Sequence, residues 1–166
     1  MSYVHRFELK TSFSSDSVIH YFRFLRSWSS SLMLSALIAM LSVLIVEDHQ
    51  AVREALTEAF LGWGHRVTAA ASLDQAITLT AGNSFDLLVT DVDLNGGDGL
   101  ELVRTLAPLR PQAAFLVISG RIGRKEVLGS GLEIGERLKY LKKPFLLSEL
   151  QAVVTEFERY WPAGTN

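Results

Sequence analysis

Five short runs, each with at least three apolar residues, alternate along the chain with longer segments in which apolar residues recur at helical spacing. The first run covers residues 43–46, and the others are Arg66–Ala70, Phe85–Thr90, Ala114–Ile118 and Leu138–Lys142. Short runs rich in β-branched side chains predict strands, and the spacing between them predicts helices. Strands that alternate with helices are typical of βα units, in which neighbouring strands run parallel.

Capping residues predict where two of the helices begin. Ser72 with Gln75, and Ser148 with Gln151, form the capping-box pattern before the second and last helices. In the fourth helical segment, residues 124–134, two glycines each cost about 1 kcal/mol relative to alanine, so we expect that helix to be frayed. Five βα units predict a flavodoxin-like α/β fold: a doubly wound, five-stranded parallel sheet in the order 2-1-3-4-5, with helices on both faces.

Polar side chains capable of chemistry follow four of the predicted strands. Glu47 and Asp48 follow the first strand, Asp91 the third, Ser119 the fourth and Lys143 the fifth. In an open parallel sheet, ligands bind just outside the carboxyl ends of the strands. Three carboxylates, a hydroxyl and an ammonium gathered there predict a site for a divalent cation and a phosphoryl group.

Each of these residues has an expected role and a structural alternative. Asp91 is the expected nucleophile, because an ionised carboxylate that attacks phosphorus gives an acyl phosphate. Glu47 and Asp48 are expected to bind the cation, since Mg²⁺ takes one or two carboxylates and keeps several waters. The alternatives are an Asp91 that caps a loop, an Asp48 that caps the next helix and a Lys143 that is a solvated surface residue.

The order and spacing of these residues resemble the receiver domain of two-component response regulators, the CheY-like family, over most of the chain. The resemblance implies that Asp91 is the phosphoacceptor. It also implies that Mg²⁺ is ligated by Asp48, Asp91 and the backbone carbonyl of Asp93, with Glu47 acting through water. Lys143 would pair with Asp91 at rest and with a phosphoryl oxygen during transfer, where it offsets developing charge.

The resemblance also implies a conformational switch. Ser119 stands at the family's switch hydroxyl and Tyr140 at its switch aromatic, and Pro144 matches the family's cis-proline. An ordinary core or edge-strand tyrosine is the alternative for Tyr140. In the family, phosphorylation biases one of two states through this hydroxyl and ring. We expect the signal to pass through the fourth helix, the fifth strand and the fifth helix, a surface that would also serve a homodimer.

The function implied by the resemblance is that of a stand-alone response regulator receiver in a Mg²⁺-dependent phosphorelay. A sensor histidine kinase or a histidine phosphotransfer protein would be the donor, and the downstream partner is a protein that the sequence does not identify. Such a phosphoprotein is not an enzyme, because its only chemistry is its own phosphorylation and dephosphorylation. Two rivals stay open. Asp91-Val92-Asp93, with Ser119 and Lys143 downstream, also resembles the haloacid-dehalogenase phosphohydrolases, and a pseudo-receiver would use the same face for protein binding alone.

Composition limits the other classes of function. The 166 residues are 48% hydrophobic, which suits one domain with a core of ordinary size. The formal net charge is −2 and there is no basic tract, so we expect no direct binding to nucleic acid. The chain has no cysteine, which excludes disulfides and thiolate metal sites and fits a cytoplasmic protein.

The first 40 residues differ in composition from the rest. They contain ten serines and none of the chain's glycines or prolines. The uncharged stretch 27–46 superficially resembles a signal peptide or membrane anchor, but its last four residues are the strand that must place Glu47 beside Asp91. We therefore expect an N-terminal extension, 1–40, that is disordered, loosely packed or a mis-assigned start, then a receiver domain, 41–160, and a tail, 161–166. A packed extra helix and a membrane anchor are the alternatives.

Overall fold

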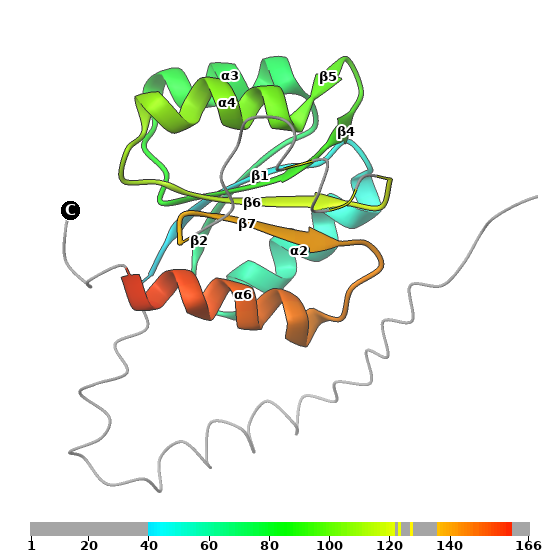
Figure 1. Cartoon of the computed structure of the whole chain (residues 1–166), viewed down its shortest axis with the longest axis vertical. Coiled ribbons are helices and arrows are strands. Elements are labelled where there is room, and N and C mark those ends of the chain that lie inside the picture. The colour runs from blue at the N-terminus through cyan, green and yellow to red at the C-terminus, as the bar shows by residue number, and fades with distance from the viewer. Residues whose placement is uncertain (1–39, 122, 124–126, 128–135, 161–166) are drawn as a thin grey trace, which may run out of the picture. The chain divides into compact units, whose positions relative to one another are not determined.

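A parallel sheet forms the centre of the computed structural model, which describes residues 40–121, 123, 127 and 136–160 (Figure 1). The neighbouring strands are, in order, β2 (Arg66–Ala70), β1 (Ser42–Val46), β3 (Leu87–Asp91), β6 (Ala114–Ser119) and β7 (Leu138–Lys142). Every neighbouring pair is parallel. Numbered by chain order within this sheet, the arrangement is 2-1-3-4-5, so the predicted fold class and strand order are confirmed.

Helices cover both faces of the sheet. In Figure 1, α3 (Leu73–Gly82) and α4 (Gly99–Leu109) lie on one face, and α2 (Gln50–Gly62) and α6 (Leu147–Tyr160) lie on the other. Side chains alternate along β1, so Leu44 and Val46 enter one apolar cluster while Val43 and Ile45 enter the other. A strand buried on both faces is apolar almost throughout, which is why β1, β3 and β6 read as short apolar runs, whereas the edge strands β2 and β7 also carry polar residues.

The predicted start of α3 is correct and that of α6 is wrong. Ser72 Oγ accepts a hydrogen bond from the N–H of Gln75 at 3.3 Å, as a capping residue should. At α6, by contrast, Ser148 lies inside the first turn. The N–H of Leu146 donates to Glu149 Oε2 at 2.6 Å, and the Leu146 carbonyl accepts from Leu150 at 3.2 Å. The side chain of Glu149 therefore satisfies the backbone at this helix start, and Leu146 carries no side-chain signal for it.

A short hairpin after β3 was not predicted. Strands β4 (Asp93–Leu94) and β5 (Gly97–Asp98) pair antiparallel, and Gly96 in the turn has a φ of 85°, which favours glycine. Most of the expected fourth helix, 124–134, lies outside the described residues, as do residues 1–39 and the tail 161–166. The predicted domain boundaries therefore stay predictions. Among the residues described, no helix has both the length and the apolar character needed to cross a bilayer.

A buried histidine joins three elements at the amino ends of the strands. His65 Nδ1 accepts a hydrogen bond from the N–H of Leu41 at 3.4 Å, and His65 Nε2 lies 3.5 Å from Glu158 Oε1 on α6. The imidazole also lies beside the ring of Phe60. Burial lowers the pKa of His65 and raises the pKa of Glu158. Burial therefore shifts both groups toward their neutral forms, and the imidazole accepts at Nδ1 from the backbone.

Candidate functional site

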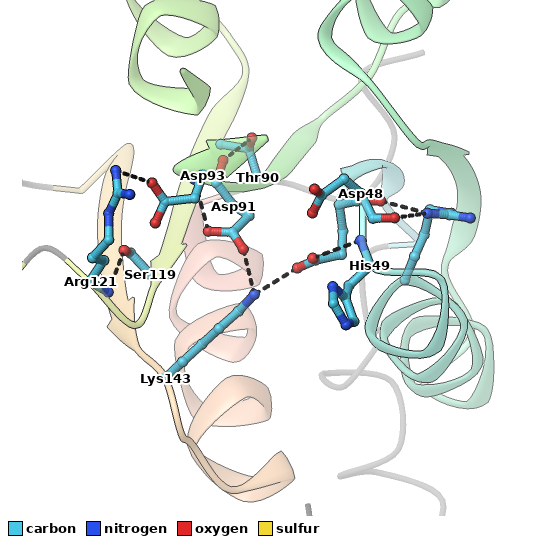
Figure 2. Close-up of polar contacts among 10 residues, drawn as sticks. Asp48, His49, Thr90, Asp91, Asp93, Ser119, Arg121 and Lys143 are labelled. Carbon is cyan, nitrogen blue, oxygen red and sulfur yellow. Dashed lines mark hydrogen bonds and ion pairs between the residues drawn. The ribbon is translucent and has the colours of Figure 1, made fainter. Parts of the chain in front are cut away.

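The carboxyl ends of β1, β3, β6 and β7 bring five of the predicted site residues to one edge of the sheet. Asp91 is the last residue of β3, Ser119 is the last residue of β6, and Lys143 follows β7. Glu47 and Asp48 follow β1, and Asp48 lies across the site from Asp91 (Figure 2). The grouping follows from topology, because parallel strands all end at the same edge of a sheet.

Lys143 bridges two carboxylates. Its Nζ donates to Asp91 Oδ2 at 2.7 Å and to Glu47 Oε2 at 2.7 Å (Figure 2). Burial opposes the charged ammonium, but the two carboxylates outweigh burial and raise the pKa of Lys143. The pairing of Lys143 with Asp91 at rest was expected from the resemblance, whereas its bond to Glu47 was not. The Lys143–Pro144 peptide bond is cis, as expected.

Glu47 is the most buried carboxylate of the site, with 2% of its surface exposed. Burial raises the pKa of Glu47, and the ammonium of Lys143 together with the backbone N–H of His49 opposes that rise. The His49 N–H donates to Glu47 Oε1 at 3.2 Å. A buried carboxylate needs partners of this kind, because an unpaired buried charge is costly. Each oxygen of the Glu47 carboxylate therefore accepts a hydrogen bond.

Three carboxylates form a group that suits a divalent cation. Glu47, Asp48 and Asp91 each offer an oxygen, and these oxygens lie within 4.8 Å of one another. Two oxygens on one Mg²⁺ ion lie at most about 4.2 Å apart, since each Mg–O distance is about 2.0–2.1 Å. These oxygens would therefore hold the ion after a small inward movement or with one carboxylate acting through water. Three carboxylates and one ammonium leave a formal charge of −2, which a divalent ion neutralises.

Arg121, in the loop after β6, contacts two residues of the site, Ser119 and Asp93. Ser119 is fully buried, and its Oγ accepts from the N–H of Arg121 at 3.1 Å. The guanidinium of Arg121 lies 2.6 Å from Asp93 Oδ1 (Figure 2). Asp93 also donates its backbone N–H to Asp91 Oδ1 at 3.2 Å. The Asp93 carboxylate is therefore paired with an arginine that sequence reasoning did not single out.

Tyr140 and Ser119 lie on adjacent strands. Tyr140 is opposite Val117 in the β6–β7 register, and its hydroxyl donates to the Ser119 carbonyl oxygen at 3.4 Å. The ring packs, partly buried, against the cluster beneath α3 and α4. The two predicted switch residues are therefore in contact, and Tyr140 has a core position as well.

Gly99 is a site residue that sequence reasoning missed. A Cβ at this position would lie 1.9 Å from the Asp91 carbonyl oxygen and 2.7 Å from Thr90 Oγ1. The Gly99 N–H donates to the Val92 carbonyl at 2.9 Å. The start of α4 thus packs directly on the backbone of the predicted nucleophile. The only signal in the sequence was a glycine directly after the helix-capping Asp98.

Comparison with known proteins decides the family. The sequence model of the response regulator receiver domain matches residues 43–155. The chain belongs to this family. The receiver is 38% identical over 113 residues to the KDP operon transcriptional regulatory protein KdpE of Escherichia coli, a match that covers 68% of this chain and 49% of KdpE. It is 31% identical over 115 residues to the DNA-binding transcriptional regulator NtrC of Azospirillum brasilense, of which the match covers 23%.

Solved structures agree with the fold of this receiver. The chemotaxis response regulator CheY4 of Vibrio cholerae aligns with a TM-score of 0.64 and 21% identity, over 72% of this chain and 99% of CheY4. A response regulator receiver protein from Sinorhizobium medicae aligns with a TM-score of 0.64 and 25% identity, over 75% of this chain and 98% of that protein. The predicted receiver family is confirmed, and the haloacid-dehalogenase alternative is set aside. The chain spans about half or less of the curated relatives named above.

Proposed function

We propose that this receiver accepts a phosphoryl group on Asp91 from a phosphohistidine of a sensor histidine kinase or a histidine phosphotransfer protein. A carboxylate oxygen of Asp91 forms the new O–P bond, the N–P bond of the phosphohistidine breaks, and the imidazole leaves with the bonding electrons. The product is an aspartyl phosphate. The observation that carries the proposal is the Asp91 carboxylate, which is held by Lys143 and grouped with the oxygens of Glu47 and Asp48.

The residues around Asp91 have separate roles in this proposal. Glu47, Asp48 and Asp91, with the backbone carbonyl of Asp93, would hold Mg²⁺, which supplies positive charge for the oxygens of the transferring group. Lys143 is already 2.7 Å from Asp91 and needs only to shift its ammonium to a phosphoryl oxygen. The chemistry is limited to phosphorylation and dephosphorylation of the receiver itself, as befits a signalling protein.

Output would pass by protein contact. Ser119 and Tyr140 touch at the junction of β6 and β7, so a phosphoryl group on Asp91 that attracts the Ser119 hydroxyl would be felt by the Tyr140 ring. We propose that β7 and α6, with the helix expected at residues 124–134, carry this change to a partner or to a second copy in the cytoplasm. The names of KdpE and NtrC describe transcriptional regulators, but the match is confined to part of each. The stand-alone organisation and the absence of direct DNA binding stay predictions.

The test is labelling with acetyl phosphate and Mg²⁺. The unchanged chain should incorporate one alkali-labile phosphoryl group, Asp91→Asn should incorporate none, and Asp74→Asn, which changes an exposed acid on α3, is the matched control that keeps labelling. Labelling of Asp91→Asn at the rate of the unchanged chain would overturn the assignment. An unchanged chain that takes no label from acetyl phosphate or from a phosphorylated donor protein would instead favour the pseudo-receiver.

A further inference from the structure

The guanidinium of Arg53 contacts the loop that carries Glu47 and Asp48. Its Nη1 donates to the carbonyl oxygen of Glu47 at 2.7 Å and to that of Asp48 at 3.1 Å. The backbone of Arg53 is itself fixed in the first turns of α2, where its N–H donates to His49 at 2.9 Å and its carbonyl accepts from Thr57 Oγ1 at 2.8 Å. One side chain therefore holds two successive peptide carbonyls.

Holding these carbonyls restricts the side chains of the same two residues. A peptide unit is planar, so the direction of its carbonyl sets the plane that leads into the next residue. With both carbonyls of Glu47 and Asp48 directed at Arg53 on α2, the backbone of the loop has little freedom left. Hydrogen bonds from a charged donor are also roughly twice as strong as neutral ones.

Asp48 depends on this support more than Glu47 does. The Glu47 carboxylate has its own partners in Lys143 and the His49 N–H. Among the residues that the structure describes, the Asp48 carboxylate makes no hydrogen bond or ion pair, although its oxygen lies within 4.8 Å of those of Glu47 and Asp91. Its place in the group of carboxylates is therefore set by its backbone.

We propose that Arg53 is a positioning residue for the cation site, which holds the β1–α2 loop so that the carboxylates of Glu47 and Asp48 face Asp91. The inference rests on the proposed function, because it assigns Arg53 to the Mg²⁺ site of that function. The sign of the expected effect separates positioning from charge. Removing a positive charge near three carboxylates would by itself strengthen cation binding. Weaker binding on removal of Arg53 therefore reports lost positioning.

The test titrates Mg²⁺ alone into the full chain by calorimetry and repeats acetyl phosphate labelling across Mg²⁺ concentrations. Arg53→Ala should raise the Mg²⁺ dissociation constant by about tenfold or more, as the loss of groups that orient metal ligands does elsewhere. Labelling at saturating Mg²⁺ should return close to the rate of the unchanged chain. Arg53→Lys should recover part of the affinity, because one ammonium can still reach a carbonyl.

Glu54→Ala is the matched control, since it removes an exposed side-chain hydrogen bond of the same helix, from Gln50, without touching the loop. It should leave the dissociation constant unchanged. If Arg53→Ala does not fold, Arg53→Gln, whose amide donates to one carbonyl, replaces it in the same titration. An unchanged or lower dissociation constant in the folded Arg53 variants overturns the inference and leaves the proposed function standing. An unchanged chain that binds no Mg²⁺ and takes no label overturns both.

Discussion

Gly99 lies so close to Asp91 that any side chain at this position would overlap the Asp91 carbonyl oxygen, 1.9 Å from an added Cβ. Backbone lies on both sides of the contact, so neither side can yield as a flexible side chain would. Gly99→Ala should destabilise the chain by roughly 1–3 kcal/mol, as overpacking does in other interiors, and should slow labelling by moving Asp91. Urea unfolding and acetyl phosphate labelling measure the two effects.

Gly82→Ala is the control for that substitution. Gly82 ends α3, and nothing lies within 4 Å of an added Cβ there. Alanine should be neutral or should stabilise the chain by about 0.4–1 kcal/mol, because it restricts the unfolded state. Equal stability of the two alanine variants would show that the contact between Gly99 and Asp91 relaxes without cost.

Mg²⁺ should stabilise the folded chain. The cation relieves repulsion among the grouped carboxylates, and at a hundredfold excess over its dissociation constant it adds about 2.7 kcal/mol to the free energy of unfolding. Asp48→Asn should reduce that gain, whereas Asp74→Asn, an exposed acid on α3, should keep it. Thermal unfolding with and without Mg²⁺ decides the matter. A melting temperature that does not respond to millimolar Mg²⁺ contradicts a working cation site.

Ser119→Ala and Tyr140→Ala should leave labelling of Asp91 largely intact but weaken its effect on β7 and α6. Neither side chain attacks phosphorus, and the two meet through the Tyr140 hydroxyl and the Ser119 carbonyl. Tyr140→Phe keeps the ring and should retain more of the response. Amide chemical shifts of the phosphorylated and the unphosphorylated protein measure the response. Full shift changes in both alanine variants would remove these residues from the switch.

His65 should make the stability of the fold depend on pH. Burial lowers the pKa of His65 in the folded chain below its ordinary value of 6.5, so the unfolded chain takes up the proton first. The stability that the neutral imidazole contributes is complete above pH 6.5 and is lost as pH falls through the lowered folded value. The difference in unfolding free energy between the unchanged chain and His65→Gln should therefore shrink below pH 6.5.

Thr78→Ala is the control for that difference, because it removes an exposed hydroxyl that does not titrate, and its difference should be flat across the same range of pH. Making both measurements in a Glu158→Gln background removes the opposite contribution of Glu158, which lies 3.5 Å from His65 Nε2. Burial raises the pKa of Glu158, so its effect on stability falls as pH rises above its ordinary value of 4.5. A difference that is constant through pH 5–7 would mean that His65 titrates alike in both states.

Much of the fold was predictable because its signals are local. The apolar runs and helical spacing encode βα units, and parallel βα units leave few arrangements that bury both faces of a sheet. The α6 start was mispredicted because Leu146 occupies a position where the side chain of Glu149 provides the cap. The β4–β5 hairpin was missed because its strands are only two residues long.

The sequence by itself determined which residues gather at the site, since Asp48, Asp91 and Lys143 follow strands that must all end at one edge. Only the tertiary structure decided their contacts. Lys143 bonds Glu47 across 96 residues of chain, and Gly99 packs on Asp91. The physical reason is that such contacts depend on distances and directions between separate elements. No local pattern of apolar and polar residues specifies those distances before the sheet and its helices are packed.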